Sequence, residues 1–323
     1  MHAGRAKITG KTSDSYVYFS KFDNQRSWNS TNNARLDLPL SRFKPFIGGS
    51  YANTGDRTGV EIDVRVRHQE QAVFVGTAIA FSSKTALVLT GTQNLFVYDN
   101  TATFRDESLA TNLNRQSRTE TAQLRFVLTP LTTFTVTSDA IQDRFDQATT
   151  RNADSIRVMP GFEFKPFALI SGRVAVGFRH FNVLDAGTPN YDGVVANVDA
   201  AYAIRATKIS FGWTRDVNYS YDSGAPYYVL TSIPLSLTER ITSKWDAIGR
   251  AAWQRLVYPE NTSTSQAFTD NASLYGLGAG YRLAEYFRLG VDVNYSRRLS
   301  PLASTRAFSG VRAGFSVSYG SSQ

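Results

Sequence analysis

The sequence predicts an all-β fold, a transmembrane up-and-down antiparallel β-barrel, on three observations. Apolar and polar residues alternate in stretch after stretch; the segment 286–297, for example, reads YFRLGVDVNYSR, with apolar residues at the odd positions from Phe287 to Tyr295. Short joints alternate along the chain with long polar segments. The expected strands also run to about 11 to 15 residues, against about 5 or 6 in globular sheets. A membrane barrel combines these features because every second side chain meets lipid and each strand crosses the bilayer.

The expected strands number about 16, which is even, as in bacterial barrels. They are 12–22, 33–41, 44–54, 58–81, 84–98, 114–128, 133–145, 154–165, 169–182, 192–204, 206–220, 226–238, 243–258, 268–282, 286–297 and 307–319. Within 58–81 the apolar residues switch from even positions, such as Val60 and Ile62, to odd positions, such as Val73 and Val75. That segment therefore holds a bulge or consists of two strands, and counts of about 14 or 18 strands stay open.

Tight joints and long loops are expected at opposite ends of the barrel. Joints such as LTPLTTF near 130 and FKPFALI near 166 are short, whereas YDNTATFRDESLATNLN and YPENTSTSQAFTDN are long and polar. This asymmetry is typical of outer-membrane barrels, which have short periplasmic turns and long extracellular loops. A barrel of this strand number leaves a water channel unless something fills it. The loops 99–113 and 259–267 could fold inward as a constriction.

Composition limits the alternatives. No window approaches the run of about 18 apolar residues that a membrane-spanning helix needs. A mean hydropathy of -0.27 fits a barrel, and it also fits a soluble β-sandwich that turns its apolar face inward. The 323 residues include no Cys, which excludes disulfides and thiol chemistry.

We expect one barrel domain over 1–323, with 1–11 as a periplasmic tail. The start, MHAGRAKITG, lacks the apolar core of a signal peptide. The chain therefore begins either at a mature end that carries a new Met or as a protein without a targeting sequence, and we favour the first. The expected location is the bacterial outer membrane.

Polar positions opposite the apolar parity predict the residues that line the lumen. These pore-lining candidates are Arg65, Arg67, Arg125, Arg157, Arg173, Arg179, Lys208, Lys244, Arg250, Arg282, Arg288 and Arg312. Their charge agrees with a balance of 35 basic to 27 acidic residues. Rings of positive charge favour anions in a pore, although each arginine could instead pair with a carboxylate on a neighbouring strand and brace the wall. Arg215 and Arg297 have the lipid-facing parity but lie near loop ends, where a charge costs roughly 0 to 1 kcal/mol.

The last expected strand carries a local signal, in GVRAGFSVSYG. The spacing polar, any, Gly, any, any, apolar, any, aromatic is met by Arg312, Gly314, Val317 and Tyr319. This spacing resembles the C-terminal insertion signal that the barrel-assembly machinery of bacteria reads as an unpaired strand. The chain departs from that signal because GSSQ follows the aromatic residue. An ordinary amphipathic strand matches the same loose pattern.

Residues suited to catalysis or metal binding are few. The histidines are His2, His68 and His180, and no GxSxG, HExxH or P-loop motif occurs in a fitting context. Some outer-membrane barrels are lipid hydrolases, and His180 has the lipid-facing parity near a loop. A lone His beside aromatic residues is more often an interfacial group. We therefore expect no enzyme activity, catalytic residue, metal site, cofactor or nucleic-acid partner, and keep a barrel hydrolase as an alternative.

Turn-centred blocks carry a resemblance over most of the chain, roughly 33–319. Blocks such as IRVMPGFEFKPFALISGRVAVGFRHFN and LYGLGAGYRLAEYFRLGVDVNYSRR share a cadence of aromatic strand ends around short turns. In this cadence the chain resembles the "Putative beta-barrel porin 2" family of Gram-negative outer-membrane proteins. Members often accompany exopolysaccharide or capsule loci, which implies a role in moving a polymer across the outer membrane.

Together these observations predict a passive channel for small anionic solutes or an exported anionic polysaccharide. The expected partners are the lipid bilayer and lipopolysaccharide, the barrel-assembly machinery during insertion and, from the resemblance, polysaccharide export proteins. The alternative is a non-conducting barrel, closed by infolded loops, that serves as a scaffold or docking partner in a surface-polysaccharide export assembly.

Overall fold

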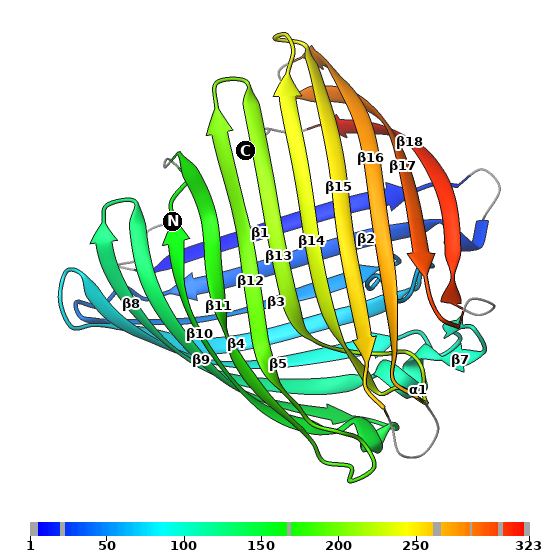
Figure 1. Cartoon of the computed structure of the whole chain (residues 1–323). Helices are drawn as coiled ribbons and strands as arrows, with labels where there is room; N and C mark the ends of the chain where they lie inside the picture. The colour runs from blue at the N-terminus through cyan, green and yellow to red at the C-terminus, as the bar shows by residue number, and fades with distance from the viewer. Residues whose placement is uncertain are drawn as a thin grey trace.

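One antiparallel sheet of 16 strands forms most of the computed structural model of the chain (Figure 1). The structure describes residues 6–19, 23–166, 169–260, 266–284, 286–302 and 306–319. The strands are β1 (Lys7–Val17), β2 (Ser27–Asp37), β3 (Phe43–Thr54), β4 (His68–Ala80), β5 (Thr85–Tyr98), β8 (Arg115–Thr129), β9 (Thr132–Phe145), β10 (Ala153–Phe164), β11 (Ile170–Val183), β12 (Tyr191–Ile204), β13 (Thr207–Tyr219), β14 (Tyr227–Arg240), β15 (Trp245–Tyr258), β16 (Phe268–Ala284), β17 (Phe287–Leu299) and β18 (Phe308–Tyr319). Each strand pairs with the next in this order. The predicted all-β fold, strand number and up-and-down order are confirmed.

The remaining elements lie in the connections between these strands. They are η1 (Asp23–Gln25), β6 (Thr103–Phe104), β7 (Glu107–Ser108), α1 (Leu109–Leu113) and η2 (Thr149–Arg151). Over the part of the chain that the structure describes, no helix has the length and apolar character needed to cross a membrane.

Short turns and long loops lie at opposite ends of the sheet (Figure 1). The turn 130–131 joins β8 to β9, whereas the segment 55–67 joins β3 to β4 and 99–114 joins β5 to β8. β1 begins and β18 ends at the turn end. The asymmetry predicted from the joints is therefore present. The start of the first strand and the end of the last strand both lie on the side of the short turns.

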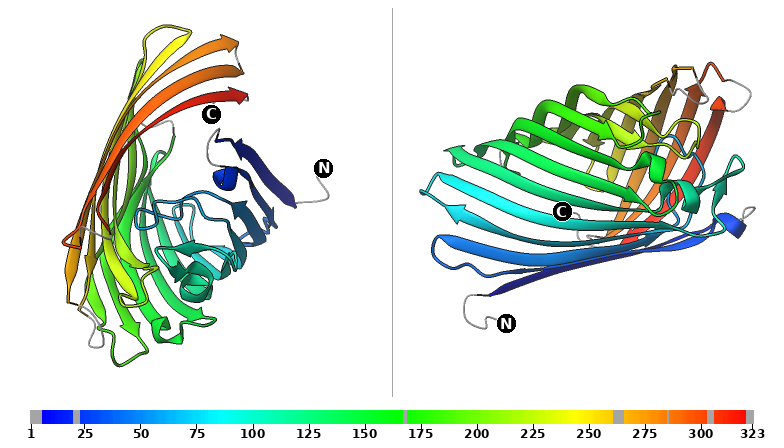
Figure 2. Two further views of the ribbon diagram at one scale, coloured as in Figure 1. Left: turned by 90° about the vertical axis from the view of Figure 1, so that its right-hand side faces the viewer. Right: turned by 90° about the horizontal axis from the view of Figure 1, so that it is seen from below.

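The sheet curves strongly but remains open at one seam (Figure 2). β1 and β18 are its two edges, and no pairing joins them among the described residues. The prediction of a closed barrel is not met here, although the two edge strands have similar lengths of 11 and 12 residues. The physical reason lies in β1, which carries polar residues on both faces, such as Thr12 and Ser13. Hydrophobic patterning then does not fix a pairing register for that strand.

Strand periodicity separates an outward apolar face from an inward polar face. Val73 and Val75 on β4, Leu277 on β16 and Val293 on β17 point outward and are more than half exposed. The loops and α1 lie on the concave side of the sheet, which is the inward face (Figure 2). The apolar parity of the sequence is thus the convex face, as expected for strands that meet lipid.

The first hairpin is displaced from its predicted position. β1 and β2 replace the expected strands 12–22 and 33–41, and the expected tail 1–11 contributes its residues from Lys7 onward to β1. The pattern misleads here because both strands are rich in Ser, Thr and Asn and have few apolar residues to mark their ends. The strands from β8 onward lie close to their predicted bounds.

The predicted strand 58–81 is a strand only in its second half, where it coincides with β4. Residues 55–67 form a loop over the inward face, in which Ile62 and Val66 are buried. The switch of apolar phase at this point therefore marks the end of a loop rather than a bulge. The even-numbered apolar residues contact other loops instead of lipid, which corrects the expectation for this segment.

Candidate functional site

The inward wall between β9 and β13 carries a network of paired charges. The Arg157 guanidinium donates to Asp139 Oδ2 at 3.0 and 2.8 Å and to Asp216 Oδ2 at 2.7 Å. Arg179 donates to Asp216 Oδ1 at 2.7 Å and to Ser155 Oγ at 2.9 Å. The Asp216 carboxylate therefore serves two arginines from different strands. Both arginines were predicted to line the pore, and both brace the wall.

Other predicted pore-lining arginines are paired in the same way. Arg125 and Arg173 flank Glu163, with nitrogen–oxygen distances of 2.9 and 3.6 Å. Arg282 and Arg288 share one carboxylate, that of Asp246, at 3.8 and 2.5 Å. These contacts join neighbouring or nearby strands on the inward face, so they support the bracing interpretation for these residues.

Two pore-lining candidates do not lie on a strand. Arg65 and Arg67 belong to the loop 55–67, just before β4. Arg65 pairs with Asp56 at 2.8 Å and donates to Ser27 Oγ at 2.7 Å, so it fixes the loop to the start of β2. Their assignment to a lumen-facing strand is wrong because the apolar residues around them pack against other loops.

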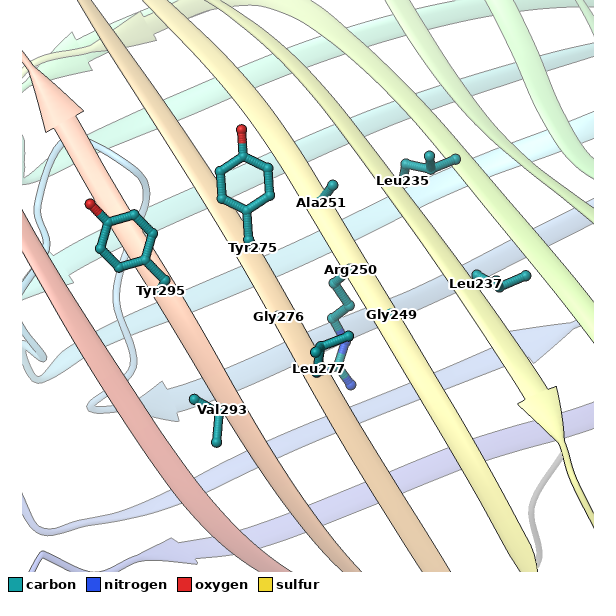
Figure 3. Close-up of a pocket in the computed structure, with 10 residues that line it drawn as sticks. All are labelled: Leu235, Leu237, Gly249, Arg250, Ala251, Tyr275, Gly276, Leu277, Val293 and Tyr295. Atoms are coloured by element: carbon teal, nitrogen blue, oxygen red, sulfur yellow. The ribbon is translucent and has the colours of Figure 1, made fainter.

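A further group of pore-lining candidates has no ion pair within the described ranges. It comprises Arg67, Lys208, Lys244, Arg250 and Arg312. Arg250 on β15 lies between Ser236 on β14 and Gly276 on β16. Its parity is opposite to that of Ala251 and Tyr275, with which it lines an apolar groove of about 560 Å³ (Figure 3). These uncompensated cations are the side chains that would attract an anion, and their role in a pore stays a prediction.

Three long loops fold together over the inward face at the loop end of the sheet. They are 55–67, 99–114 and 220–226. Ile62 from the first, Leu109 from the second and Tyr221 from the third belong to one buried apolar cluster with Tyr98, the last residue of β5. We call these three loops the loop cluster. Because the cluster is apolar inside and buried, it holds its shape as a small core.

The loop between β5 and β8 folds inward, which is one of the two possibilities that the sequence leaves open for 99–113. Its short strands β6 and β7 pair around a turn whose two central residues have positive φ values of 53° and 66°, the conformation of a tight hairpin turn. α1 follows at once, and Ser108 Oγ accepts a hydrogen bond from the Thr111 N–H at 3.3 Å as its N-terminal cap. Most of the other expected constriction, 259–267, lies outside the described residues.

Buried Glu61 fastens the loop cluster from within. Its carboxylate accepts hydrogen bonds from Ser220 Oγ at 2.6 Å, the Tyr221 N–H at 3.1 Å, the Tyr258 hydroxyl at 2.8 Å and Arg306 at 2.9 Å. Burial raises the pKa of the Glu61 carboxyl, and these donors act in the opposite direction. A buried carboxylate of this kind depends on its partners, because removing one leaves an unpaired polar group away from water.

Two buried arginines extend the network to the C-terminal strands. Arg306 contacts Asp222 at 2.8 Å and Asp270 at 3.2 Å in addition to Glu61. Arg298, near the end of β17, contacts Asp270 at 2.5 Å and the Glu61 carbonyl at 2.9 Å. The loop between β3 and β4 is thereby tied to β16 and β17. The network thus joins the two ends of the sheet that the edge strands leave apart.

Sequence reasoning does not identify this network. It places Glu61 on a lumen-facing strand, and it does not select Arg298, Arg306 or Asp270 as candidates. One signal was present, since the apolar residues around Glu61 have the phase opposite to those of β4. A carboxylate inside a buried apolar loop requires specific partners, but the sequence does not say which loops supply them.

The four residues of the C-terminal signal lie on the edge strand β18. Val317 and Tyr319 point outward and are 55 % and 83 % exposed, whereas Arg312 and Gly314 face inward. In the described part of the chain β18 pairs with β17 alone, so its other edge presents unpaired backbone groups. This is the geometry that a strand-pairing assembly machine would use.

We expect Tyr319→Ala to slow assembly several-fold, because the exposed aromatic side chain at the strand end is the most specific part of the signal. The matched control is Tyr16→Ala, since Tyr16 is an outward, exposed tyrosine on the other edge strand. The measurement is the rate at which the folded, heat-modifiable form appears in vesicles that contain the assembly machinery. Equal assembly rates for both variants and the wild type would show that Tyr319 has no role in assembly.

His180, the residue of the hydrolase alternative, lies on the outward face of β11. Its Nδ1 is 2.5 Å from Asp192 Oδ1, and both side chains are more than half exposed. The residues paired beside it on the neighbouring strands are Ile156 and Asp192, so neither offers the hydroxyl nucleophile that a serine hydrolase requires. His68 begins β4 on the inward face, and His2 lies outside the described residues.

Comparison with known proteins agrees with this architecture. The family model described as "Putative beta-barrel porin 2" matches residues 1–318. No curated protein matches the chain. Among solved structures, the FrpB iron transporter from Neisseria meningitidis (F5-1 variant) is 10 % identical, with a TM-score of 0.50 over 92 % of this chain and 59 % of that chain.

A second solved structure gives a similar result. The copper transporter OprC is 12 % identical, with a TM-score of 0.50 over 98 % of this chain and 60 % of that chain. The chain therefore spans about three fifths of the length of these transporters. At these identities the likeness concerns the fold, a curved up-and-down antiparallel sheet.

Proposed function

The chain belongs to the "Putative beta-barrel porin 2" family, and on this premise we propose that it is a passive outer-membrane channel for small anionic solutes. The observation that carries the proposal is the set of inward cations without carboxylate partners among the described residues, above all Arg250 in the middle of β15. Positive side chains of this kind favour anions, and without a tight binding site the solute can also leave. An exported anionic polysaccharide carries the same charge and would be the polymeric form of this cargo.

The proposal also specifies the surroundings of the channel. The barrel would lie in the Gram-negative outer membrane, in contact with lipid and lipopolysaccharide, after insertion by the barrel-assembly machinery. A polymeric cargo would require polysaccharide export proteins as partners. The proposed role is transport without catalysis.

A non-conducting barrel is the second candidate, and the loop cluster favours it. Buried side chains from three loops cover part of the inward face, and Glu61 ties them to the C-terminal strands. If this cluster fills the lumen, the barrel would serve as a scaffold or docking partner in a surface assembly.

A planar bilayer under a salt gradient separates the two candidates. The refolded chain is expected to conduct steadily, and the sign of its reversal potential is expected to show a preference for anions. A chain that inserts but stays silent would favour the scaffold. Conductance with clear cation preference would overturn the anion channel.

Within the same assay, Arg250→Gln is expected to lower the ratio of anion to cation permeability about two- to fourfold. One charge about 5 Å from an ion in water contributes about 0.8 kcal/mol, which screening at physiological ionic strength roughly halves. Because the charge attracts the anion and repels the cation, its removal then changes the permeability ratio by at most about fourfold. Arg255→Gln is the matched control, because Arg255 lies on the same strand with the outward parity. Equal permeability ratios for both variants and the wild type would exclude Arg250 from the conduction path.

A further inference from the structure

Three arginines lie on the outward face of the C-terminal strands at nearly the same level. They are Arg215 on β13, Arg255 on β15 and Arg297 on β17, each within four residues of the loop-side end of its strand. Their parity is that of the exposed apolar residues Trp253 and Val293. We call these three residues the arginine band. Near the loop ends a charge on the lipid-facing side costs only roughly 0 to 1 kcal/mol, so the band is tolerated there and is available to an anion at the membrane interface.

Strand register shows that the band is continuous and contains other hydrogen-bonding groups. Arg215 pairs with Thr231, Thr231 with Arg255, and Arg255 with Asn271. Serines on β16 and β18 flank Arg297 in the same manner. The outward face thus presents arginines separated by hydroxyl and amide side chains. Each of these groups can donate to an anionic oxygen.

No carboxylate compensates the band on these strands. Arg255 and Arg297 are exposed and form no ion pair within the described residues. Arg215 donates to the Val194 carbonyl at 3.1 Å and to Thr231 Oγ1 at 2.7 Å, both uncharged acceptors. In the loop half of β13–β18 the outward positions include no Asp or Glu among the residues that the structure describes. The positive charge of the band is therefore open to an external anion.

At the same level of the sheet, the outward charges on β9 to β12 are paired. On β9 and β10 the outward Arg144 pairs with Asp154 at 2.7 Å, and on β11 and β12 His180 pairs with Asp192. These pairs share the outward parity and the position near the loops. Arg118 on β8 has the same parity and donates only to the uncharged Gln93 Oε1 at 3.0 Å, so uncompensated charge is concentrated in the arginine band without being confined to it.

Aromatic residues place the band at the level of lipid head groups. Trp253 and Tyr295 lie two residues toward the turn end from Arg255 and Arg297, and they are 43 % and 39 % exposed. Tyr275 lies beside Tyr295 on the neighbouring strand (Figure 3). Exposed aromatic residues of this kind form the girdle at the boundary between membrane and water. The arginine band lies just beyond that girdle, on the loop side.

We infer that the arginine band binds the phosphate groups of a glycolipid in the outer leaflet. The planar guanidinium group makes paired hydrogen bonds to phosphate oxygens, which an ammonium group does not. The phosphate belongs to a lipid rather than to a free solute, because the band faces away from the lumen and continues an apolar, aromatic surface. Lipid chains would cover that surface while the phosphates meet the arginines.

The test is a titration of bisphosphorylated lipid A into the refolded full chain in neutral detergent, with bound lipid counted by native mass spectrometry. Dephosphorylated lipid A and inorganic phosphate are the comparison ligands. The variants are Arg255→Gln and the triple change R215Q/R255Q/R297Q, and Arg144→Gln is the matched control at the same level. Heat-modifiable mobility on a gel shows that each variant is folded before the titration.

The wild type is expected to bind bisphosphorylated lipid A about tenfold more tightly than Arg255→Gln and about 100-fold more tightly than the triple variant, as for loss of charge-assisted hydrogen bonds. Arg144→Gln should bind like the wild type. Equal binding by the triple variant, or equal binding of dephosphorylated lipid A, would overturn the inference. Displacement by an equal concentration of inorganic phosphate would assign the band to free anions and overturn the lipid assignment. Conductance is not part of the readout, so failure of the channel proposal leaves this result intact.

Discussion

Replacing Glu61 by alanine is expected to release the loop cluster and to raise the conductance of the channel. The change removes the carboxylate that Arg306, Tyr258 and Ser220 contact, and it leaves the Arg306 guanidinium 3 % exposed with fewer partners. Breaking a buried ion pair by removing one partner costs about 3 to 5 kcal/mol. The loops would then open more often, because the β3–β4 loop would keep only the hydrogen bond from Arg298 to the main-chain carbonyl of residue 61 and the packing of Val60 as ties to the C-terminal strands.

Hydrogen exchange measures this opening directly. The amides of α1 and the Tyr221 amide, which donates to Glu61, should lose protection by about 10²- to 10⁴-fold in Glu61→Ala, which follows from the cost of about 3 to 5 kcal/mol. Asp63→Asn is the matched control, since Asp63 lies in the same loop and forms no ion pair within the described part of the chain. Unchanged protection and unchanged conductance in Glu61→Ala would show that the cluster is held by its apolar core alone.

The sequence predicts the strands well where lipid imposes alternation. From β8 to β17 the outward face of each strand is mostly apolar in its turn-side half, where it must meet the bilayer, so the bounds and parity of these strands are visible in the sequence. β1 and β2 carry Ser, Thr and Asn on both faces, and there the predicted bounds shift by several residues. The prediction of a strand for the first half of 58–81 is wrong for a related reason. The alternating valines and isoleucine of the loop 55–67 pack in a buried cluster of loops and do not face lipid.

The candidate site is predictable only in part. Parity alone assigns Arg157, Arg179 and Arg250 to the inward face, because a charge in the middle of the lipid-facing surface is costly. Whether each one is paired depends on strands that are not adjacent in the sheet, since Arg157 on β10 reaches Asp216 on β13. The curvature of the sheet sets this reach, and curvature is not encoded in any single strand.

Asp216→Asn is expected to destabilise the barrel by about 3 to 5 kcal/mol, the cost of removing one partner from a buried ion pair. The substitution keeps the size of the side chain and removes its charge, so the effect comes from the arginines. Arg157 retains Asp139, but Arg179 is 7 % exposed and retains only Ser155 Oγ, with its Nε unpartnered within the described residues. The loss should therefore arise mainly at Arg179.

A double-mutant cycle with Arg179→Gln tests this assignment, using the free energy of unfolding in urea for the chain refolded into vesicles. If Asp216 stabilises the wall through Arg179, the double variant should be less destabilised than the sum of the two single variants, by at least about 1 kcal/mol. Asp199→Asn, on the inward face of β12 and without an ion pair in the described ranges, is the control and should change the free energy of unfolding by less than about 0.5 kcal/mol. Additive effects would mean that the two residues act independently. The Asp216 network would then be a consequence of the curved wall and not one of the contacts that hold it.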